Sequence, residues 1–292
     1  MQLEQAGPLQ LKLLKQTNQY LFNNNQGAFP LVIPNEKTKE SRTMNIAIAG
    51  IAFLYGILIG SFLNVLIYRI PKHENFTTTR SHCMECGYQL RWYDLVPLFS
   101  YLFLRGKCRK CKAPISKQYP LVEFCNGVAY AVILLLCGFN VEGILYCLLF
   151  SALLALSVID FRTYEIPVGF NLFILLLGII RLATDVDNWL TYIIGFFAIS
   201  SFIYMIILLT QGRGMGGGDC KLMACAGLLL GWKQIILAFF LGCILGSILH
   251  LIRMKCSDEE HVLAFGPYLS AGIMISALFG QQMIDWYLQF LL

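Results

Sequence analysis

Long apolar runs alternate with short polar segments along the chain from residue 45 onward. A helix needs about 20 apolar residues to cross the hydrocarbon core of a bilayer, so the pattern predicts about eight transmembrane helices. The fourth and sixth runs are short for a full span, and we expect them to tilt or to lie where the bilayer is thin. The runs lie near residues 45–68, 121–139, 143–159, 168–183, 190–210, 220–232, 234–252 and 262–284.

Two segments depart from this pattern. Residues 69–119 form a polar insert with four cysteines between the first and second runs. Residues 1–43 contain polar stretches at 23–27 and 34–42, show no sustained helical stripe and do not resemble a signal peptide. Met44 stands directly before the first run and is a candidate natural start, in which case this tail of unknown role is not native. The expected divisions are the tail, a first transmembrane helix at 44–68, the insert at 69–119 and a membrane domain at 120–292.

Composition supports a membrane protein. Of the 292 residues, 57% are hydrophobic and 13% are charged, and the mean hydropathy is +0.64. Soluble proteins average about 45–50% apolar and about 25% charged residues, so a soluble globule of this sequence would lack the polar side chains to cover its surface. The sequence therefore predicts an all-α polytopic membrane protein, and it argues against a soluble enzyme and a disordered chain. The net charge of +5 suits loops at one membrane face and does not indicate nucleic-acid binding.

Lysine and arginine residues are distributed unevenly between the two sides of the predicted helices. Fifteen fall on the side of the insert, and only Arg181 and Lys233 fall on the other. Because cytoplasmic loops are enriched in basic residues, this distribution places the insert in the cytoplasm. The five basic residues of 1–43 would then lie outside, a conflict that disappears if translation starts at Met44.

The insert contains two C-x-x-C pairs with 21 residues between them. This spacing is typical of a zinc ribbon, in which two tight turns supply four thiolates to one tetrahedral Zn²⁺. Gly87 and Gly106 supply the backbone freedom that such turns need. Four thiolates leave no open coordination position, so we expect a structural zinc; a metal-free loop is the alternative, and disulfides are disfavoured in a reducing cytoplasm. The predicted ligands are Cys83, Cys86, Cys108 and Cys111.

Two aspartates stand at helix ends on the insert's side of the membrane. Asp160 ends the third run, and Asp219 opens the sixth after Gly216-Gly217-Gly218. Ionisable residues at such positions are costly and are functional candidates. Two carboxylates at one depth suit peptide hydrolysis, one activating a water as general base and the other, protonated, polarising the scissile carbonyl. The alternatives are that each carboxylate is simply solvated, or that Asp160 pairs with Arg162 or Lys221.

Several motifs follow one another along residues 45–290. They are Gly60-Ser61-Phe62-Leu63-Asn64-Val65, Arg80-Ser81-x-Cys83-x-x-Cys86, Leu95-Val96-Pro97-Leu98-Phe99-Ser100-Tyr101, Arg105-Gly106-Lys107-Cys108-x-x-Cys111, Tyr119-Pro120-Leu121-Val122-Glu123, Asp160 with Ile166-Pro167, Gly216-Gly217-Gly218-Asp219-x-Lys221-Leu222, and Phe265-Gly266-Pro267. In this order they resemble the type IV prepilin peptidases with fused N-methyltransferase activity. The seventh motif is similar to the G-x-G-D motif of that family, with one additional glycine.

The resemblance implies a multi-pass enzyme of the bacterial inner membrane. Asp160 and Asp219 would be the catalytic pair of an aspartic endopeptidase, which removes the leader from type IV prepilin or pseudopilin precursors at the cytoplasmic face. The enzyme would then methylate the new N-terminal residue with S-adenosyl-L-methionine, a step linked to the cysteine insert. The expected partners are these precursors and membrane lipid, with no nucleic acid.

The sequence leaves three alternatives open. Glu123 is a candidate for cofactor binding, because a carboxylate can offset the sulfonium charge of S-adenosyl-L-methionine. The alternative is that Glu123 only begins the second helix or pairs with a nearby base such as Lys117. A family member with peptidase activity alone is the second alternative. A non-enzymatic, zinc-bearing membrane adaptor or transporter is the third, although it would need polar residues deep inside several spans, where this sequence has few.

Overall fold

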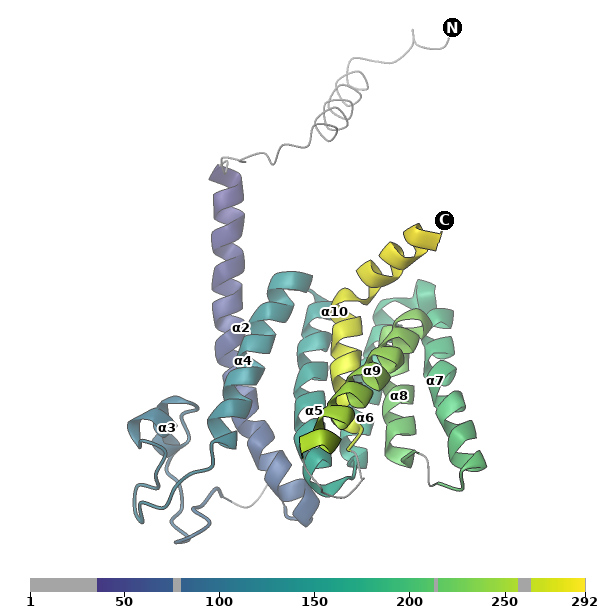
Figure 1. The fold of residues 1–292 in the computed structure, drawn as a ribbon. Helices are drawn as coiled ribbons and strands as arrows, with labels where there is room; N and C mark the ends of the chain where they lie inside the picture. The colour runs from purple at the N-terminus through teal and green to yellow at the C-terminus, as the bar shows by residue number, and fades with distance from the viewer. Residues whose placement is uncertain (1–35, 76–79, 213–214, 257–263, 292) are drawn as a thin grey trace, which may run out of the picture. The chain divides into compact units, whose positions relative to one another are not determined.

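The computed structural model describes residues 36–75, 80–212, 215–256 and 264–291 (Figure 1). Over these residues the regular structure is helical, and β-pairing is limited to two isolated bridges in the insert. The predicted all-α fold is therefore confirmed for this part of the chain. The long helices are α2 (Glu36–Arg69), α4 (Gln118–Cys137), α5 (Val141–Thr163), α6 (Val168–Thr184), α7 (Trp189–Leu209), α8 (Gly217–Leu230), α9 (Trp232–Cys256) and α10 (Gly266–Leu291).

Five helical segments are long and apolar enough to cross a membrane. They are Ile46–Lys72, Gln118–Cys137, Val141–Thr163, Val186–Leu209 and Trp232–Ile252. Helices α6 and α8, with 17 and 14 residues, are short, as the sequence predicts for the fourth and sixth runs. Helix α10 has 26 residues, but Gln281, Gln282 and Asp285 interrupt its second half. The described residues thus show five candidate spans where the apolar pattern predicts about eight.

Helix α5 is the most buried of the five candidate spans. In its most apolar window 61% of the residues are buried, against 28–33% in the other four. It packs against α4, α6 and α10, and Leu149, Leu153, Leu156 and Ile159 on it are fully buried. Asp160 follows Ile159 directly, so the fold brings a carboxylate to the end of its central helix.

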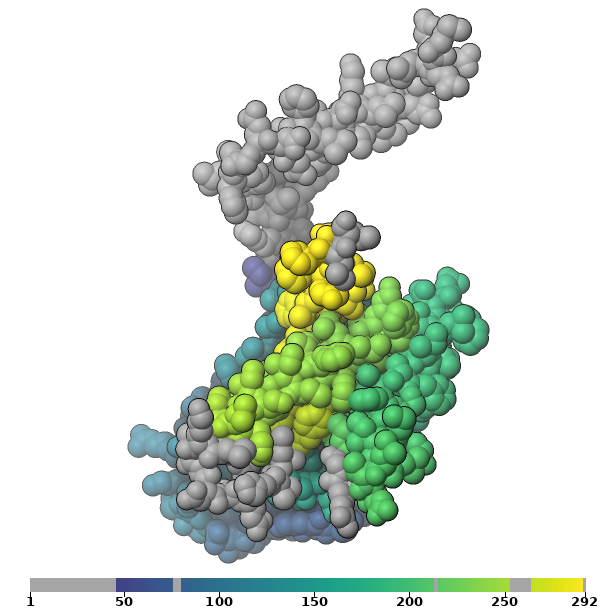
Figure 2. Space-filling view, turned by 45° about the vertical axis from the view of Figure 1, so that its right-hand side comes forward, coloured from purple at the N-terminus to yellow at the C-terminus, as the bar shows by residue number. Residues whose placement is uncertain are grey.

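The outward faces of α7 and α9 are apolar. Phe197 and Leu208 on α7, and Phe240, Ile244 and Ile248 on α9, are all more than half exposed. Figure 2 shows this face, which α9 crosses in light green beside α7. Exposing this much apolar surface to water is unfavourable, whereas lipid covers it in a membrane.

A buried chain of polar side chains joins α2, α4 and α5. Asn126 on α4 donates from Nδ2 to the carbonyl of Gly56 on α2 at 2.7 Å. On α5, the Ser151 hydroxyl donates to Asn126 Oδ1 at 2.9 Å and lies 3.0 Å from the hydroxyl of Tyr130. Because lipid offers these groups no alternative partner, such bonds fix how the three helices pack.

The insert has little regular structure of its own. Between α2 and α4 it contains a 3-10 turn at Trp92–Asp94 and the five-residue helix α3 (Phe99–Phe103). The two bridges, His82 with Gln89 and Lys107 with Pro114, each enclose one C-x-x-C pair. A segment with so few packed elements depends on its cross-links for a defined shape.

Candidate active site, cavity and metal centre

Both C-x-x-C pairs lie on turns of the same construction. In the first turn, the N–H of Cys83 donates to Tyr88 and the carbonyl of Cys83 accepts from Gly87, both at 2.9 Å. The equivalent bonds around Cys108 measure 2.8 and 3.1 Å. Gly87 has φ +65°, and Lys112, its counterpart in the second turn, has φ +63°. The conformation expected of Gly87 is confirmed, whereas the same conformation at a lysine could not be predicted from residue type.

The two turns bring four sulfur atoms together. The Sγ atoms of Cys83, Cys86, Cys108 and Cys111 all lie within 4.8 Å of one another, and those of Cys83 and Cys111 are 3.8 Å apart. Tetrahedral coordination with Zn–S bonds of about 2.3 Å separates two sulfurs by about 3.8 Å. The predicted clustering of the four cysteines is therefore confirmed, and its dimensions suit a metal ion of the size and softness of Zn²⁺.

The backbone around the cluster favours thiolates. The N–H groups of Cys111 and Lys110 point at the sulfur of Cys108 and lower the pKa of that thiol to about 6. At Cys111 the N–H of Ala113 also favours the thiolate, but burial and the neighbouring sulfurs outweigh it and raise the pKa to about 12. Crowded thiols of this kind oppose one another's ionisation, and a bound dication removes that opposition.

An ion pair holds the second cysteine turn against the rest of the insert. Arg109 Nε donates to Asp94 Oδ1 at 2.7 Å, and the Asp94 side chain is 1% exposed. The other carboxylate oxygen accepts from the N–H of Arg91 at 3.2 Å. The Arg109 guanidinium also lies 5.0 Å from the centre of the Tyr93 ring. Asp94 could not be predicted as part of this site, because nothing near it in the chain indicates its pairing with Arg109.

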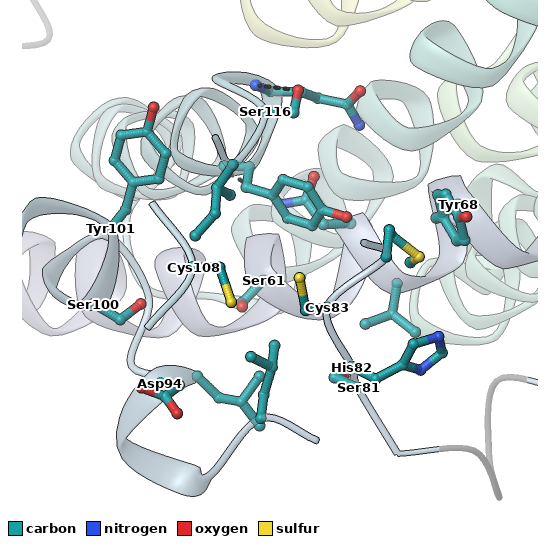
Figure 3. A pocket seen from close by; sticks show the side chains of 18 of the residues that line it. Ser61, Tyr68, Ser81, His82, Cys83, Asp94, Ser100, Tyr101, Cys108 and Ser116 are labelled. Atoms are coloured by element: carbon teal, nitrogen blue, oxygen red, sulfur yellow. Dashed lines mark hydrogen bonds between the residues drawn. The ribbon is translucent and has the colours of Figure 1, made fainter. Parts of the chain in front are cut away.

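A cavity of about 440 Å³ lies between the insert, α2 and α4 (Figure 3). Cys83 and Cys108 contribute to its wall from the two cysteine turns, and Ser61 and Tyr68 contribute from α2. Glu123 of α4 also lines it. The metal cluster and the cofactor candidate Glu123, predicted separately, thus share one cavity.

Glu123 is buried, with 6% of its surface exposed. Its Oε2 accepts from the N–H of Leu98 at 2.8 Å, and the carboxylate also bonds the hydroxyl of Ser61. It forms no ion pair with Lys117 or any other described cation. Glu123 therefore does more than begin a helix, since it connects α2, α4 and the start of α3.

Asp160 lies at the end of α5 and is 4% exposed. Its Oδ2 accepts from the N–H of Gly266, the first residue of α10, at 2.9 Å. A Cβ atom at Gly266 would stand 2.7 Å from that oxygen, so glycine is needed for the contact. The amino end of α10 thus presents a backbone donor and its positive dipole to Asp160.

Asp219 lies in the first turn of α8 and is 9% exposed. Its carboxylate bonds the backbone N–H of Gly216, the residue that caps this helix. A Cβ atom at Gly218 would stand 2.9 Å from Cβ of Ile166, whereas one at Gly217 would meet nothing within 4 Å. The close approach of the glycine segment to the loop between α5 and α6 therefore depends on Gly218.

The two aspartates face a common environment. Helices α6 and α10 each pack against both α5 and α8, and the carboxylates of Asp160 and Asp219 are close enough for their charges to interact. Among the described residues neither aspartate forms an ion pair, and Arg162 donates instead to Gln118. The pairing of Asp160 with Arg162 or Lys221, left open by the sequence, is not present. Neither aspartate lines the cavity of the insert.

Comparison with known proteins gives consistent matches over both halves of the chain. The family described as the bacterial peptidase A24 N-terminal domain matches residues 54–137, and the type IV leader peptidase family matches residues 147–251. Proteins named prepilin leader peptidase/N-methyltransferase are 34% identical in Stutzerimonas stutzeri, over 82% of this chain and 93% of the relative. The equivalent figures are 34%, 81% and 92% for Pseudomonas aeruginosa, and 31%, 82% and 97% for Bacillus subtilis. No solved structure matches the chain.

Proposed function

Because this chain belongs to the type IV prepilin leader peptidase/N-methyltransferase family, we propose that it cleaves the leader from prepilin-like precursors and methylates the new N-terminal residue. The observation that carries the peptidase proposal is the convergence of two buried carboxylates, Asp160 of α5 and Asp219 of α8, neither of which forms an ion pair within the described part of the chain. The substrates we propose are type IV prepilin and pseudopilin precursors.

In the proposed topology α6, α8 and α10 join the five candidate spans, giving eight helices in the bacterial inner membrane. The uneven distribution of basic residues supports a cytoplasmic location for the insert. Asp160 and Asp219 then lie at the cytoplasmic ends of their helices. The apolar helix of a precursor would lie among the spans, with its leader reaching the aspartates from the cytoplasm.

In the proposed hydrolysis the aspartate pair carries a single proton, because two close carboxylates do not both ionise readily. The ionised member takes a proton from a water as its oxygen attacks the scissile carbonyl carbon. The protonated member donates to the carbonyl oxygen, and the departing amine receives a proton as the C–N bond breaks. The N–H groups of Gly266 and Gly216 hold the two carboxylates in place during these transfers.

The proposed methyl transfer depends on the insert. S-adenosyl-L-methionine, when bound, supplies an electrophilic methyl group. The protein must hold the free amine in line with that group and accept the proton that the amine loses. The Zn²⁺ that we propose for the four cysteines is structural, because four thiolates fill its coordination sphere.

Incubating the purified protein with a prepilin precursor tests both activities. We expect cleavage of the leader with or without S-adenosyl-L-methionine, and a gain of one methyl group on the product only when it is present. Mass spectrometry of the product measures both changes. Cleavage without methylation would identify a peptidase alone, and an uncleaved precursor would contradict the proposal.

A further inference from the structure

We propose that the cavity between α2, α4 and the insert binds the methyl donor, with Glu123 and Asn64 as its polar contacts. This inference rests on the methyltransferase activity proposed above and locates its binding site for the methyl donor in the fold. The cavity measures about 440 Å³, within the range of about 300–1,000 Å³ that small-molecule sites occupy. It therefore has room for a nucleoside-sized ligand.

Asn64 gives the cavity an unused hydrogen-bond acceptor. Its residue surface is 2% exposed, and its Nδ2 donates to the carbonyls of Gly60 at 3.3 Å and Tyr119 at 3.1 Å. Because both neighbours are acceptors, the amide must present its NH₂ to them, which leaves Oδ1 without a partner. Buried polar atoms are rarely left unpaired in native proteins, so this oxygen indicates a missing donor. A hydroxyl, amino or ammonium group of a ligand would supply it.

Glu123 gives the cavity a charge without a counterion. Of the carboxylates that line the cavity, Asp94 is neutralised by Arg109, and Glu74 and Glu85 are exposed to solvent. Glu123 is buried, accepts bonds only from neutral groups and forms no ion pair among the described residues. A buried carboxylate is costly unless a positive charge compensates it. The sulfonium of the methyl donor carries such a charge.

Aromatic rings also favour a positively charged ligand with a flat base. Tyr68, Tyr101 and Tyr119 all line the cavity. The face of such a ring attracts cations and stacks on planar groups. The buried carboxylate, the unpaired amide oxygen and the three tyrosines offer contacts to the sulfonium, the amino group and the base of S-adenosyl-L-methionine.

The transfer balances in atoms and in charge. The neutral N-terminal amine attacks the methyl carbon and forms the C–N bond as the S–CH₃ bond breaks, and its electron pair passes to sulfur. Sulfonium becomes neutral thioether, and the methylated amine, now an ammonium, releases one proton. Glu123, no longer facing a sulfonium, is then free to accept that proton. The charge of the cavity is unchanged at each stage.

The position of the cavity also connects it with the aspartates. Arg162 lines the cavity and follows Asp160 by two residues on α5, and it donates to Gln118 at the start of α4. The wall of the cavity therefore reaches the end of α5 that carries Asp160. In this proposal the trimmed amine passes from the aspartates to the cavity while the pilin helix stays in the membrane.

The test measures binding with and without the ligand's positive charge. The zinc-loaded protein in detergent is titrated with S-adenosyl-L-methionine and with S-adenosyl-L-homocysteine, which lacks the sulfonium. We expect Glu123→Gln to weaken binding of the charged ligand about tenfold, the size of one charge-assisted contact, and to change binding of the neutral ligand less than twofold. Asp187→Asn, on an exposed turn away from the cavity, is the matched control and should change neither.

Equal effects of Glu123→Gln on both ligands, or no effect on either, would overturn the inference. Photochemical cross-linking of radiolabelled S-adenosyl-L-methionine to the wild-type protein tests the site without any substitution. We expect label in peptides from the cavity wall, which contain residues 61–69, 81–109 or 113–123, and label confined to other peptides would overturn it. A wild-type protein that binds neither ligand would contradict the methyltransferase proposal itself, whereas binding outside the cavity contradicts only this inference.

Discussion

Individual backbone conformations decide how well the functional side chains are held. A Cβ atom at Gly216 would approach the Asp219 carboxylate, and one at Gly218 would approach Ile166. A Cβ atom at Gly217, between them, would meet nothing within 4 Å. The sequence does not show which of the three glycines tolerates a side chain, because this depends on Ile166, which lies beside Gly218 only in the folded chain. The distinction makes the glycine segment testable residue by residue.

Gly218→Ala is expected to impair leader cleavage, while Gly217→Ala is tolerated. The new Cβ at residue 218 would stand 2.9 Å from Cβ of Ile166 and push Asp219 away from its partner. A displacement of about 1 Å at a catalytic group costs about 100-fold in rate. Cleavage rates of the two purified variants measure the difference. Equal rates would show that contact with Ile166 does not position Asp219.

The cysteine turns provide a second comparison between matched residues. Gly87 and Lys112 have nearly the same positive φ, which costs a residue with a Cβ atom roughly 1–2 kcal/mol. We expect Lys112→Gly to slow the loss of zinc to a competing chelator and Gly87→Ala to accelerate it. Zinc release followed with a colorimetric chelator measures both. If both substitutions changed the rate of zinc loss in the same direction, the two turns would not be equivalent, contrary to the proposal.

At the scale of elements, helix α5 and the insert illustrate what the sequence predicts and what it does not. The apolar runs located the helices, and the cysteine spacing predicted a cluster that the fold confirms. Helices α6 and α8 are short and α10 has polar residues in its second half, so five candidate spans remain. Packing against neighbouring helices can hold such short or polar helices. The contact of Gly266 with Asp160 joins residues 106 positions apart, a distance over which a single sequence gives no pairing signal.

Removal of zinc is expected to separate the two activities. The cysteine turns form one wall of the cavity, whereas Asp160 and Asp219 lie on α5 and α8. Cys83→Ser should therefore loosen residues 69–119 and reduce methylation at least about tenfold, the loss typical when support around a functional site is removed. Cleavage should change only a few-fold. Metal analysis, proteolysis of the insert and assays of both reactions measure these effects.

Cys125→Ser, a change at a cysteine outside the cluster, is the control for loss of a thiol. It should leave the zinc content near one ion per chain, as expected for four thiolates around one ion. An insert that stays folded and protease-resistant without metal would contradict the structural role of zinc. So would a wild-type protein purified without zinc that still methylates.

At the scale of the whole molecule, buried hydrogen bonds connect the helices that carry the two proposed sites. Asn126 and Ser151 link α4, which carries Glu123, to α5, which carries Asp160. Both polar residues lie inside apolar runs, and the sequence alone gave no reason to connect them, since their spacing along the chain matches no local motif. The motifs along the chain predict the two sites, but only the packed helices show that hydrogen bonds join the helices that carry them.

Asn126→Leu is expected to weaken the packing of α4 against α2 and α5. It removes the bond to Gly56 and leaves the hydroxyl of Ser151 without its acceptor. A single interhelical hydrogen bond in a membrane contributes about 0.6 kcal/mol on average and up to about 1.7, so we expect unfolding in detergent to require about 1–2 kcal/mol less. Ser157→Ala, which removes a bond within α5 only, is the control. Equal stability of the two variants would contradict a role for the network in packing.

The most direct test of the central claim is leader cleavage by Asp160→Asn, Asp219→Asn and the double variant, with methylation of a pre-trimmed pilin measured on the same preparations. Each single change should reduce cleavage about 1,000-fold or more, because it removes the acid or the base of the pair. The double variant should be hardly slower, since residues that act as a unit are not additive. Methylation should stay within about twofold of wild type, which shows that the variants are folded. Substantial cleavage by either single variant would contradict the account.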